Sequence, residues 1–252
     1  MITYRIFKVW RRDMVVWKKN VIFYLMANFL EPLIYLVAMG YGVGHFIGQI
    51  QGMSYLQFLA PAMIVFSVMN GVTFETTYGS YTRLKEQKTA LGIAMTPVSM
   101  AEVVGGEILW AATKAMLSGS TIFLVLWLLN VLHSPWIALM PLVMLVTAFF
   151  FSSLGMLMTS FSRSYDFFSY YYTLVISPMF VFSGTFFPLE PFPKWVQALA
   201  HLLPLTYSIQ VARHLFNGIF TWGDGLILLG ITGVGLLLTL WATRRLVRDI
   251  IV

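Results

Sequence analysis

Six long apolar stretches divide this chain, and they restrict it to proteins that cross a membrane several times. Each stretch has about the 20 residues that a helix needs to cross the hydrocarbon core of a bilayer. We therefore predict an all-α integral membrane protein with six transmembrane helices, built as one domain over residues 1–252. The stretches are Val21 to Gly44, Tyr55 to Gly79, Val103 to Asn130, Trp136 to Ser160, Phe167 to Phe187 and Gly225 to Thr243.

Basic residues lie on alternate connections between these stretches. If the N-terminus is cytoplasmic, thirteen of the sixteen Lys and Arg residues lie inside, namely six before the first stretch and then Arg83, Lys85, Lys88, Arg163, Arg244, Arg245 and Arg248. The opposite orientation would reverse this ratio and violate the positive-inside rule. We predict a multi-pass protein of the bacterial inner (cytoplasmic) membrane with both termini in the cytoplasm.

The composition excludes several other classes of protein. Hydrophobic residues make up 59% of the chain and charged residues 10%, and the mean hydropathy is +0.80. The net charge of +6 is explained by contact with anionic membrane lipids, so no nucleic-acid partner is expected. Because the chain has no cysteine, a disulfide framework and a thiolate metal site are excluded, and we expect no metal.

The first 20 residues have the pattern of an amphipathic helix that lies in the inner interface. Apolar residues recur at steps of three and four, and basic residues gather on the roughly opposite face. Two interpretations remain open, an ordinary membrane anchor and an elbow helix that contacts a partner protein. The apolar positions are Phe7, Trp10, Met14, Trp17 and Val21, and the basic ones are Arg5, Lys8, Arg12 and Lys19.

The connection over residues 80–102 is the largest one on the cytoplasmic side. Its polar run from Arg83 to Lys88 predicts a short helix that ends at or before Thr96, because Pro97 disfavours helical geometry in the preceding residue. One interpretation is a solvated loop with positive-inside charges. The other is a rigid element that docks a partner and transmits a push to the spans.

The connection over residues 188–218 is too long and too apolar for a plain outer loop. Pro193 and Pro204 are each positioned to begin a short helix. Both helices are too short to cross the bilayer, which favours a re-entrant or interfacial pair. Trp195 and Leu199 share one face of the first helix, so the pair is either a surface hairpin or a cap over the outer end of a translocation path.

Four charged residues lie within or near the spans, where an unpaired charge costs about 3 kcal/mol on insertion scales. Glu107 and Lys114 are seven residues apart on one helix and face similar directions. Glu31 or Glu75 would supply Lys114 with a partner from a neighbouring helix. A structural ion-pair network in the inner half is the preferred interpretation, and a proton relay is the functional alternative.

The sequence contains no recognisable catalytic motif. There is no Gly-Lys dipeptide and hence no phosphate-binding P-loop, and no HExxH, GxSxG or paired-carboxylate arrangement is present. The four histidines are dispersed on the outer side. A dense aromatic run begins the fifth stretch, at Tyr165, Phe167, Phe168, Tyr170, Tyr171 and Tyr172. These rings form either an interfacial belt or a surface for sugars and acyl chains.

Several segments resemble the ABC type-2 permeases, and the resemblance covers nearly the whole chain. The branch that these segments resemble most is the NodJ-like permeases, named for nodulation lipo-oligosaccharide export; the wider family also includes polysaccharide and drug exporters. The segments are EPLIYLVAMGYGVG at Glu31 to Gly44, FLAPAMI at Phe58 to Ile64, TFETTYGSYTRL at Thr73 to Leu84, GEILWAATKA at Gly106 to Ala115, SRSYDFFSYYYTLVISPMFVFSGTFFPLE at Ser162 to Glu190 and LLPLTYS at Leu202 to Ser208.

The resemblance implies a permease homodimer that works with two copies of a separate ATP-binding subunit. ATP and Mg²⁺ would belong to that subunit, so this chain would bind no cofactor and would not itself be an enzyme. Residues 1–20 would be the elbow helix, and residues 83–95 would contain the coupling helix, with Arg83, Leu84, Lys85, Glu86 and Lys88 as candidate contacts.

An amphipathic substrate, such as a lipo-oligosaccharide, a glycolipid or a drug-like molecule, would move outward between the two permeases. We expect Tyr170, Tyr171, Tyr172 and Phe180 to line this path and Trp195, Leu199 and Pro204 to form the outer cap. Two other classes remain as alternatives. A proton-coupled secondary transporter would usually show an internal repeat, which is not found, and a membrane-embedded lipid- or glycan-modifying enzyme would need clustered polar groups.

Overall fold

A computed structural model describes residues 4–19, 21–47, 49–50, 52–132 and 134–251. Within these ranges the chain is helical apart from one hairpin of two short antiparallel strands, in which Gln49 of β1 (Gln49–Ile50) faces Ser54 of β2 (Met53–Ser54). The prediction of an all-α protein is therefore confirmed.

Four of the predicted spans are helices long and apolar enough to cross a membrane, counted over the described residues. The first is α4 (Tyr55–Phe74), which continues through the π-helical turn η2 (Glu75–Gly79) and then η3 (Thr82–Glu86). The others are α6 (Met100–Leu128), the turn η4 (Pro135–Leu139) together with α7 (Met140–Phe161), and α12 (Trp222–Ile251).

The first and fifth predicted spans are more irregular. α2 (Val21–Val37) contains Pro32, which has no backbone N–H to donate, and continues as the π-helical η1 (Ala38–Val43) and the short α3 (Gly44–Ile47). α8 (Asp166–Tyr171), η5 (Tyr172–Ile176) and α9 (Ser177–Phe182) follow one another directly. The helix formed by α8, η5 and α9 ends at Phe182, before the predicted end at Phe187. Gly184 turns the chain there, since its φ is +74°. The segment from Asp166 to Phe182 is shorter than the four long helices.

α4 is the central element of the bundle, and almost all of its side chains are buried. It packs against α2, α6, α7 and α11 (Pro204–Phe216). Gly155 of α7 permits the closest approach, since a Cβ atom built there would lie 2.0 Å from Oγ1 of Thr76. The core therefore lies around α4, with the other helices covering it.

Serine caps begin two of the long helices. Ser54 before α4 and Ser99 before α6 each form a capping box, with Gln57 and with Glu102 respectively. Pro97 precedes the second cap, in agreement with the predicted end of the preceding helix near Thr96; that helix is α5 (Thr89–Ala94). The Ser99 cap fixes where the connection over residues 80–102 passes into α6.

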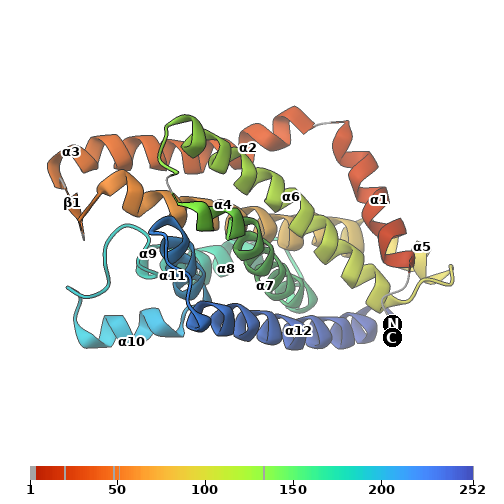
Figure 1. Cartoon of the computed structure of the whole chain (residues 1–252). Coiled ribbons are helices and arrows are strands. Elements are labelled where there is room, and N and C mark those ends of the chain that lie inside the picture. The colour runs from red at the N-terminus through yellow and green to blue at the C-terminus, as the bar shows by residue number, and fades with distance from the viewer. Residues whose placement is uncertain (1–3, 20, 48, 51, 133, 252) are drawn as a thin grey trace.

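The bundle has two distinct ends (Figure 1). α1 (Arg5–Lys18), α5 and the C-terminal part of α12 lie at one of them, which we call the basic end after its Lys and Arg residues. α3, β1 and α10 (Lys194–Leu202) lie at the opposite end. The predicted N-terminal helix forms as α1 and packs along α6, where Val9 sits against Gly106 and Trp10 Nε1 donates to Oγ1 of Thr113 at 3.1 Å.

The two short helices predicted at residues 188–218 also form. Pro193 immediately precedes α10, and Pro204 is the first residue of α11. α10 buries Val196 and Ala200 and leaves Trp195 and Leu199 exposed, so these two residues do share one face. α11 instead packs on α4 and is largely buried.

Candidate functional site

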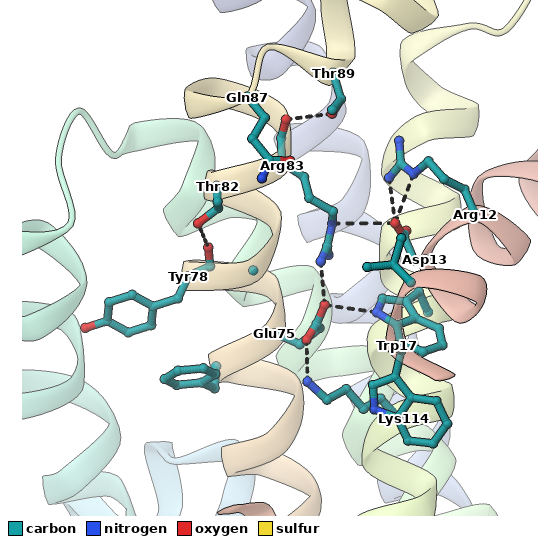
Figure 2. A pocket seen from close by; sticks show the side chains of 14 residues that line it. Arg12, Asp13, Trp17, Glu75, Tyr78, Thr82, Arg83, Gln87, Thr89 and Lys114 are labelled. Atoms are coloured by element: carbon teal, nitrogen blue, oxygen red, sulfur yellow. Dashed lines mark hydrogen bonds and ion pairs between the residues drawn. The ribbon is translucent and has the colours of Figure 1, made fainter. Parts of the chain in front are cut away.

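Six charged side chains from three elements meet at the basic end of the bundle. They are Arg12 and Asp13 of α1, Glu75 and Arg83 of the extension of α4, and Glu107 and Lys114 of α6. We call this group the charge cluster; Figure 2 shows five of its side chains around a cavity. With three cations and three carboxylates, the group carries no net formal charge.

Arg83 is the centre of the charge cluster. Its Nη1 lies 2.8 Å from Oε1 of Glu75, and its Nη2 lies 2.5 Å from Oε2 of Glu107. Its Nε is 3.7 Å from Oδ1 of Asp13. One guanidinium therefore joins carboxylates from three helices through donors spread over a planar fork, whereas a Lys ammonium has its three donors on a single atom.

Glu75 is buried beneath Arg83, and its other oxygen pairs with Lys114. Oε2 lies 2.7 Å from Nζ of Lys114, while Oε1 also accepts from Nε1 of Trp110 at 2.9 Å. Gly79 makes room for this arrangement, because a Cβ atom there would be 3.0 Å from Oε1 of Glu75. The predicted partnership between Lys114 and an acid of a neighbouring helix is thus present with Glu75, whereas the side chain of Glu31 lies outside the described part of the chain.

Glu107 is fully buried and joins α6 to both other elements. It accepts from Ser80 Oγ at 2.7 Å and pairs with Arg12 Nη2 at 2.8 Å, in addition to Arg83. Such complete pairing is what a buried charge requires, since an unpaired one is strongly destabilising. The preferred interpretation, a structural ion-pair network, describes this geometry.

Asp13 is the least compensated carboxylate of the charge cluster. It accepts from Arg12 at 2.9 Å through Oδ1 and is almost completely buried. Burial and the nearby charge of Glu107 raise the pKa of Asp13 to about 6, against the opposing effect of Arg83 and Arg12. Its charge therefore changes close to physiological pH.

A cavity of about 480 Å³ opens beside the charge cluster. Its wall comes from α1, from the extension of α4 and from α6, and it reaches Thr89 at the start of α5. Figure 2 shows Arg83, Glu75 and Lys114 in a row on one side of it, with Asp13 and Trp17 facing them. The cavity therefore contacts both the helices of the bundle and the connection that precedes α6.

The five candidate coupling residues divide into inward-facing and exposed ones. Arg83 belongs to the charge cluster, Leu84 is buried, and Lys85 donates to the backbone oxygen of Ser162 at 2.8 Å. Glu86 and Lys88 are exposed. The prediction of a separate polar helix from Arg83 to Lys88 was wrong. η3 instead continues α4 as far as Glu86, and the helix is interrupted at Lys88, where φ is +51°. The separate short helix is α5.

The four residues predicted to line a path do not share one surface of the chain. Tyr170 is exposed, Tyr172 is half-buried and Tyr171 is buried. Phe180 is also buried, with its ring 3.8 Å from that of Phe66. Since 170, 171 and 172 are consecutive on a helix, their different directions are expected. Of the four, Tyr170 is the one that faces outward from this chain.

The opposite end contains a second buried arginine, Arg213 of α11. Its Nη2 donates to the backbone oxygens of Gly184 at 2.7 Å and Thr185 at 3.2 Å, and its Nε donates to that of Phe58 at 3.3 Å. The guanidinium also lies 3.7 Å from the centre of the Phe58 ring. Burial lowers the pKa of Arg213 to about 10. This residue fastens α11 to α4 and to the loop after α9.

Sequence reasoning missed three members of the site. Arg12 was assigned to the solvated face of α1, and Asp13 and Trp110 were not singled out. One signal was available, because Asp13 is the sole acidic residue among the first 20. An acid in such a basic segment indicates a specific cationic partner, here Arg12 and Arg83.

Four helices long and apolar enough to cross a membrane, counted over the described residues, define a polytopic membrane protein. The chain belongs to the ABC-2 type transporter family, whose sequence profile matches residues 4–217. It is a permease, the membrane subunit of such a transporter.

Named relatives agree with this assignment. Nodulation protein J of Rhizobium leguminosarum bv. viciae is 41% identical over 212 residues, which are 83% of this chain and 81% of that protein. Nodulation protein J of Rhizobium meliloti (strain 1021) is 39% identical over 213 residues, with 83% and 80% covered. The inner membrane transport permease YadH of Escherichia coli (strain K12) is 26% identical over 209 residues, with 82% and 79% covered.

Proposed function

We propose that this chain is the permease of an ATP-driven exporter and works as a homodimer with two copies of a separate ATP-binding subunit. All six apolar stretches cross the inner membrane, both termini are cytoplasmic, and the basic end faces the cytoplasm. The family assignment and the positive-inside distribution of Lys and Arg support this arrangement.

The observation that carries the proposal is the continuity from α4 into η3 together with the charge cluster. A docked subunit displaces α5 together with the exposed Glu86 and Lys88, and α5 is joined to η3 by the hydrogen bond from Thr89 Oγ1 to the backbone oxygen of Arg83 at 2.6 Å. η3 then passes the displacement to α4, with which it forms an unbroken helix. Arg83 then passes it to α6 and α1 through Glu107 and Asp13. In this mechanism α5 and the residues before it are the coupling element, and α1 is the elbow helix.

The substrate proposed is an amphipathic molecule, such as a lipo-oligosaccharide, a glycolipid or a drug-like compound. Tyr170 is exposed and available to a path between two copies, whereas Phe180 is buried against Phe66. α10, with exposed Trp195 and Leu199, and α11, which begins at Pro204, form the re-entrant cap at the outer end. Lipid contacts surround the remaining surface.

A proton-coupled transporter is less well supported by the same geometry. A proton path needs titratable groups at several depths in the membrane. Among the described residues, the three paired acids of the charge cluster gather at one end of the bundle. The ion pairs that Glu75 and Glu107 form with Arg83, Lys114 and Arg12 suit a mechanical joint.

Purification with and without the ATP-binding subunit tests the proposal. We expect no ATP hydrolysis by the isolated chain and measurable hydrolysis by its complex with the cognate subunit in nanodiscs. Lys88→Glu should weaken the complex, since Lys88 is exposed next to α5, while Lys194→Glu at the opposite end should not. ATP hydrolysis by the isolated permease, or no association with any ATP-binding subunit encoded beside it, would refute the proposal.

A further inference from the structure

The C-terminal part of α12 carries three arginines on one face at the basic end of the bundle. Arg244 and Arg245 lie four and three residues before Arg248, and Trp241 precedes them at the same helical spacing. All four side chains are exposed, and together they line a cavity of about 260 Å³. We call these four residues the arginine face. Since α12 lies along one side of the bundle (Figure 1), a ligand can reach this face from outside.

The positive charge of the arginine face is not balanced within the part of the chain that the structure describes. There, the ion pairs involve the cations of the charge cluster and His214, and none involves an arginine of α12. Like charges three or four residues apart on a helix repel one another. An anion shared by the three guanidinium groups removes this repulsion, so the cavity favours an anionic ligand.

Aromatic rings hold one of these guanidinium groups in place. Cζ of Arg245 lies 3.9 Å from the centre of the ring of Phe161, the last residue of α7. The same ring meets Trp241 edge to face, with ring centres 5.9 Å apart. A guanidinium over an aromatic face keeps the N–H donors at its edge available. A fork of donors that matches the oxygens of a phosphate is therefore positioned before a ligand binds.

Exposed apolar side chains continue from the arginine face along α12. Leu237 lies four residues before Trp241, and Leu240 lies four residues before Arg244, so both adjoin the face on the helix surface. α12 is long and apolar enough to cross a membrane, and Trp is common where head groups meet hydrocarbon. The surface therefore fits a ligand with an anionic head and apolar chains, whereas a free phosphate would leave the leucines uncovered.

We propose that the arginine face is a binding site for the phosphate of an anionic phospholipid from the membrane leaflet at the basic end. Basic pockets at the membrane surface bind such head groups. The bound lipid holds the C-terminal part of α12 and the end of α7 at the depth of the head groups, because Arg245 and Phe161 contact each other. This inference goes beyond the proposed function, since the site requires neither a transported substrate nor an ATP-binding subunit.

Native mass spectrometry of the delipidated permease in detergent tests this site. Dioleoyl phosphatidylglycerol is titrated, and the affinity of the first bound lipid is measured. Arg244→Gln combined with Arg248→Gln should lower this affinity about 10- to 30-fold, because each arginine near an anionic surface contributes about a fivefold step. Arg11→Gln combined with Lys18→Gln is the matched control, which removes the same charge from exposed positions of α1. It should change the affinity less than about 2-fold, since exposed charges far from the lipid are screened by salt.

Further measurements identify what the site recognises. Arg244→Lys combined with Arg248→Lys keeps both charges and should recover part of the affinity that the Gln pair loses, because Lys binds phosphate as a point charge. Dioleoyl phosphatidylcholine should bind at least about 10-fold more weakly than phosphatidylglycerol, one tenfold step in affinity, and glycerol phosphate in large excess should not displace the lipid.

Three results would overturn the proposal. Equal affinity of the Gln pair and the α1 control for phosphatidylglycerol would remove the site from α12, even if the Gln pair lost association with the ATP-binding subunit, which would make the face a protein-docking surface. No recovery in the Lys pair, or equal binding of phosphatidylcholine, would show that charge is not recognised. Displacement by glycerol phosphate would assign the face to soluble phosphate compounds.

Discussion

Two buried arginines hold the two ends of the bundle together in different ways. Arg83 is bound by carboxylates from three elements, whereas Arg213 is bound by three backbone oxygens and the ring of Phe58. A carboxylate on a side chain can move with its helix and can be exchanged for another. Backbone oxygens fix a loop in one place. The basic end is therefore suited to transmit motion, and the Arg213 end is suited to stay closed.

Removing one carboxylate from the basic end should give the largest effect. Glu107→Gln leaves the partly buried Arg83 and Arg12 with one less negative partner, so we expect the free energy of unfolding to fall by about 2–3 kcal/mol, below the cost of breaking a fully buried pair. Dodecyl sulfate unfolding followed by circular dichroism measures this loss. Asp166→Asn, at an exposed carboxylate of α8, is the control and should change it by less than about 0.5 kcal/mol. Equal stability of the two variants would show that the charge cluster is not a joint.

At the opposite end, the hydrogen bonds can be removed only by a change of Arg213 itself, because their acceptors are backbone atoms. Arg213→Met retains apolar volume and leaves the three carbonyl oxygens without their donor, at a cost of about 1–3 kcal/mol. We expect the loop from Ser183 to Pro193 to become sensitive to protease as well. Lys194→Met on the exposed face of α10 is the control. Normal stability and an intact loop would contradict the assigned role of Arg213.

The pH dependence of stability distinguishes the ends further, because Asp13 has a raised pKa. A group whose pKa is about 6 in the folded protein and 3.8 when unfolded binds more protons in the folded state between these values. Stability should therefore rise as pH falls from 7 towards 4, by about 1–2 kcal/mol after allowance for solvent screening. Asp13→Asn should remove this component of the pH dependence, whereas Arg213→Met should retain it. A wild type that loses stability over this window, with no difference in Asp13→Asn, would refute the assignment.

The smallest effect on stability is expected at the exposed docking positions. Lys88→Glu should alter the free energy of unfolding by less than about 0.5 kcal/mol, yet it should weaken association with the ATP-binding subunit. Lys85→Glu should lower the free energy of unfolding and leave association with the ATP-binding subunit unchanged, since Lys85 donates to the backbone oxygens of Ser160 and Ser162. Parallel unfolding and co-purification measurements separate the two roles. If Lys88→Glu assembles normally, docking must involve α5 alone.

Much of the fold was predictable because apolar length and proline position are local properties. The four long helices, α10 and α11 follow from them directly. The prediction extended the fifth span too far, to Phe187, because the Phe residues at its end are apolar. Their apolar character does not reveal that Gly184 turns the chain before them. The polar run after Tyr81 was read as a separate helix, although the break occurs at Lys88, and no pattern in the sequence marks a Lys with positive φ.

The candidate site was only partly predictable for a different reason. Glu75, Glu107 and Lys114 attract attention because charges inside spans are rare. Arg83 was predicted only as a docking contact and Arg12 only as part of a basic helix face, since arginines near the inner ends of spans are already explained by the positive-inside rule. The side chains of both arginines point inward because they pair with Glu107 of another helix. The pattern of residues along one helix predicts which face is polar, but it does not predict which helix that face contacts.

The central claim is that the charge cluster carries motion from the docking segment to the opposite end of the bundle. Because the chain contains no cysteine, a single Ala198→Cys on the exposed face of α10 can take a spin label without further changes. The distance between the two labels of the homodimer is measured by double electron–electron resonance in nanodiscs, with the ATP-binding subunit bound, before and after trapping with ATP, Mg²⁺ and vanadate. Arg83→Lys keeps the charge and loses the fork that joins three carboxylates. We predict that trapping shifts the distance in the otherwise unchanged permease and fails to shift it in Arg83→Lys, although the subunit still binds; the same shift in both would contradict the claim.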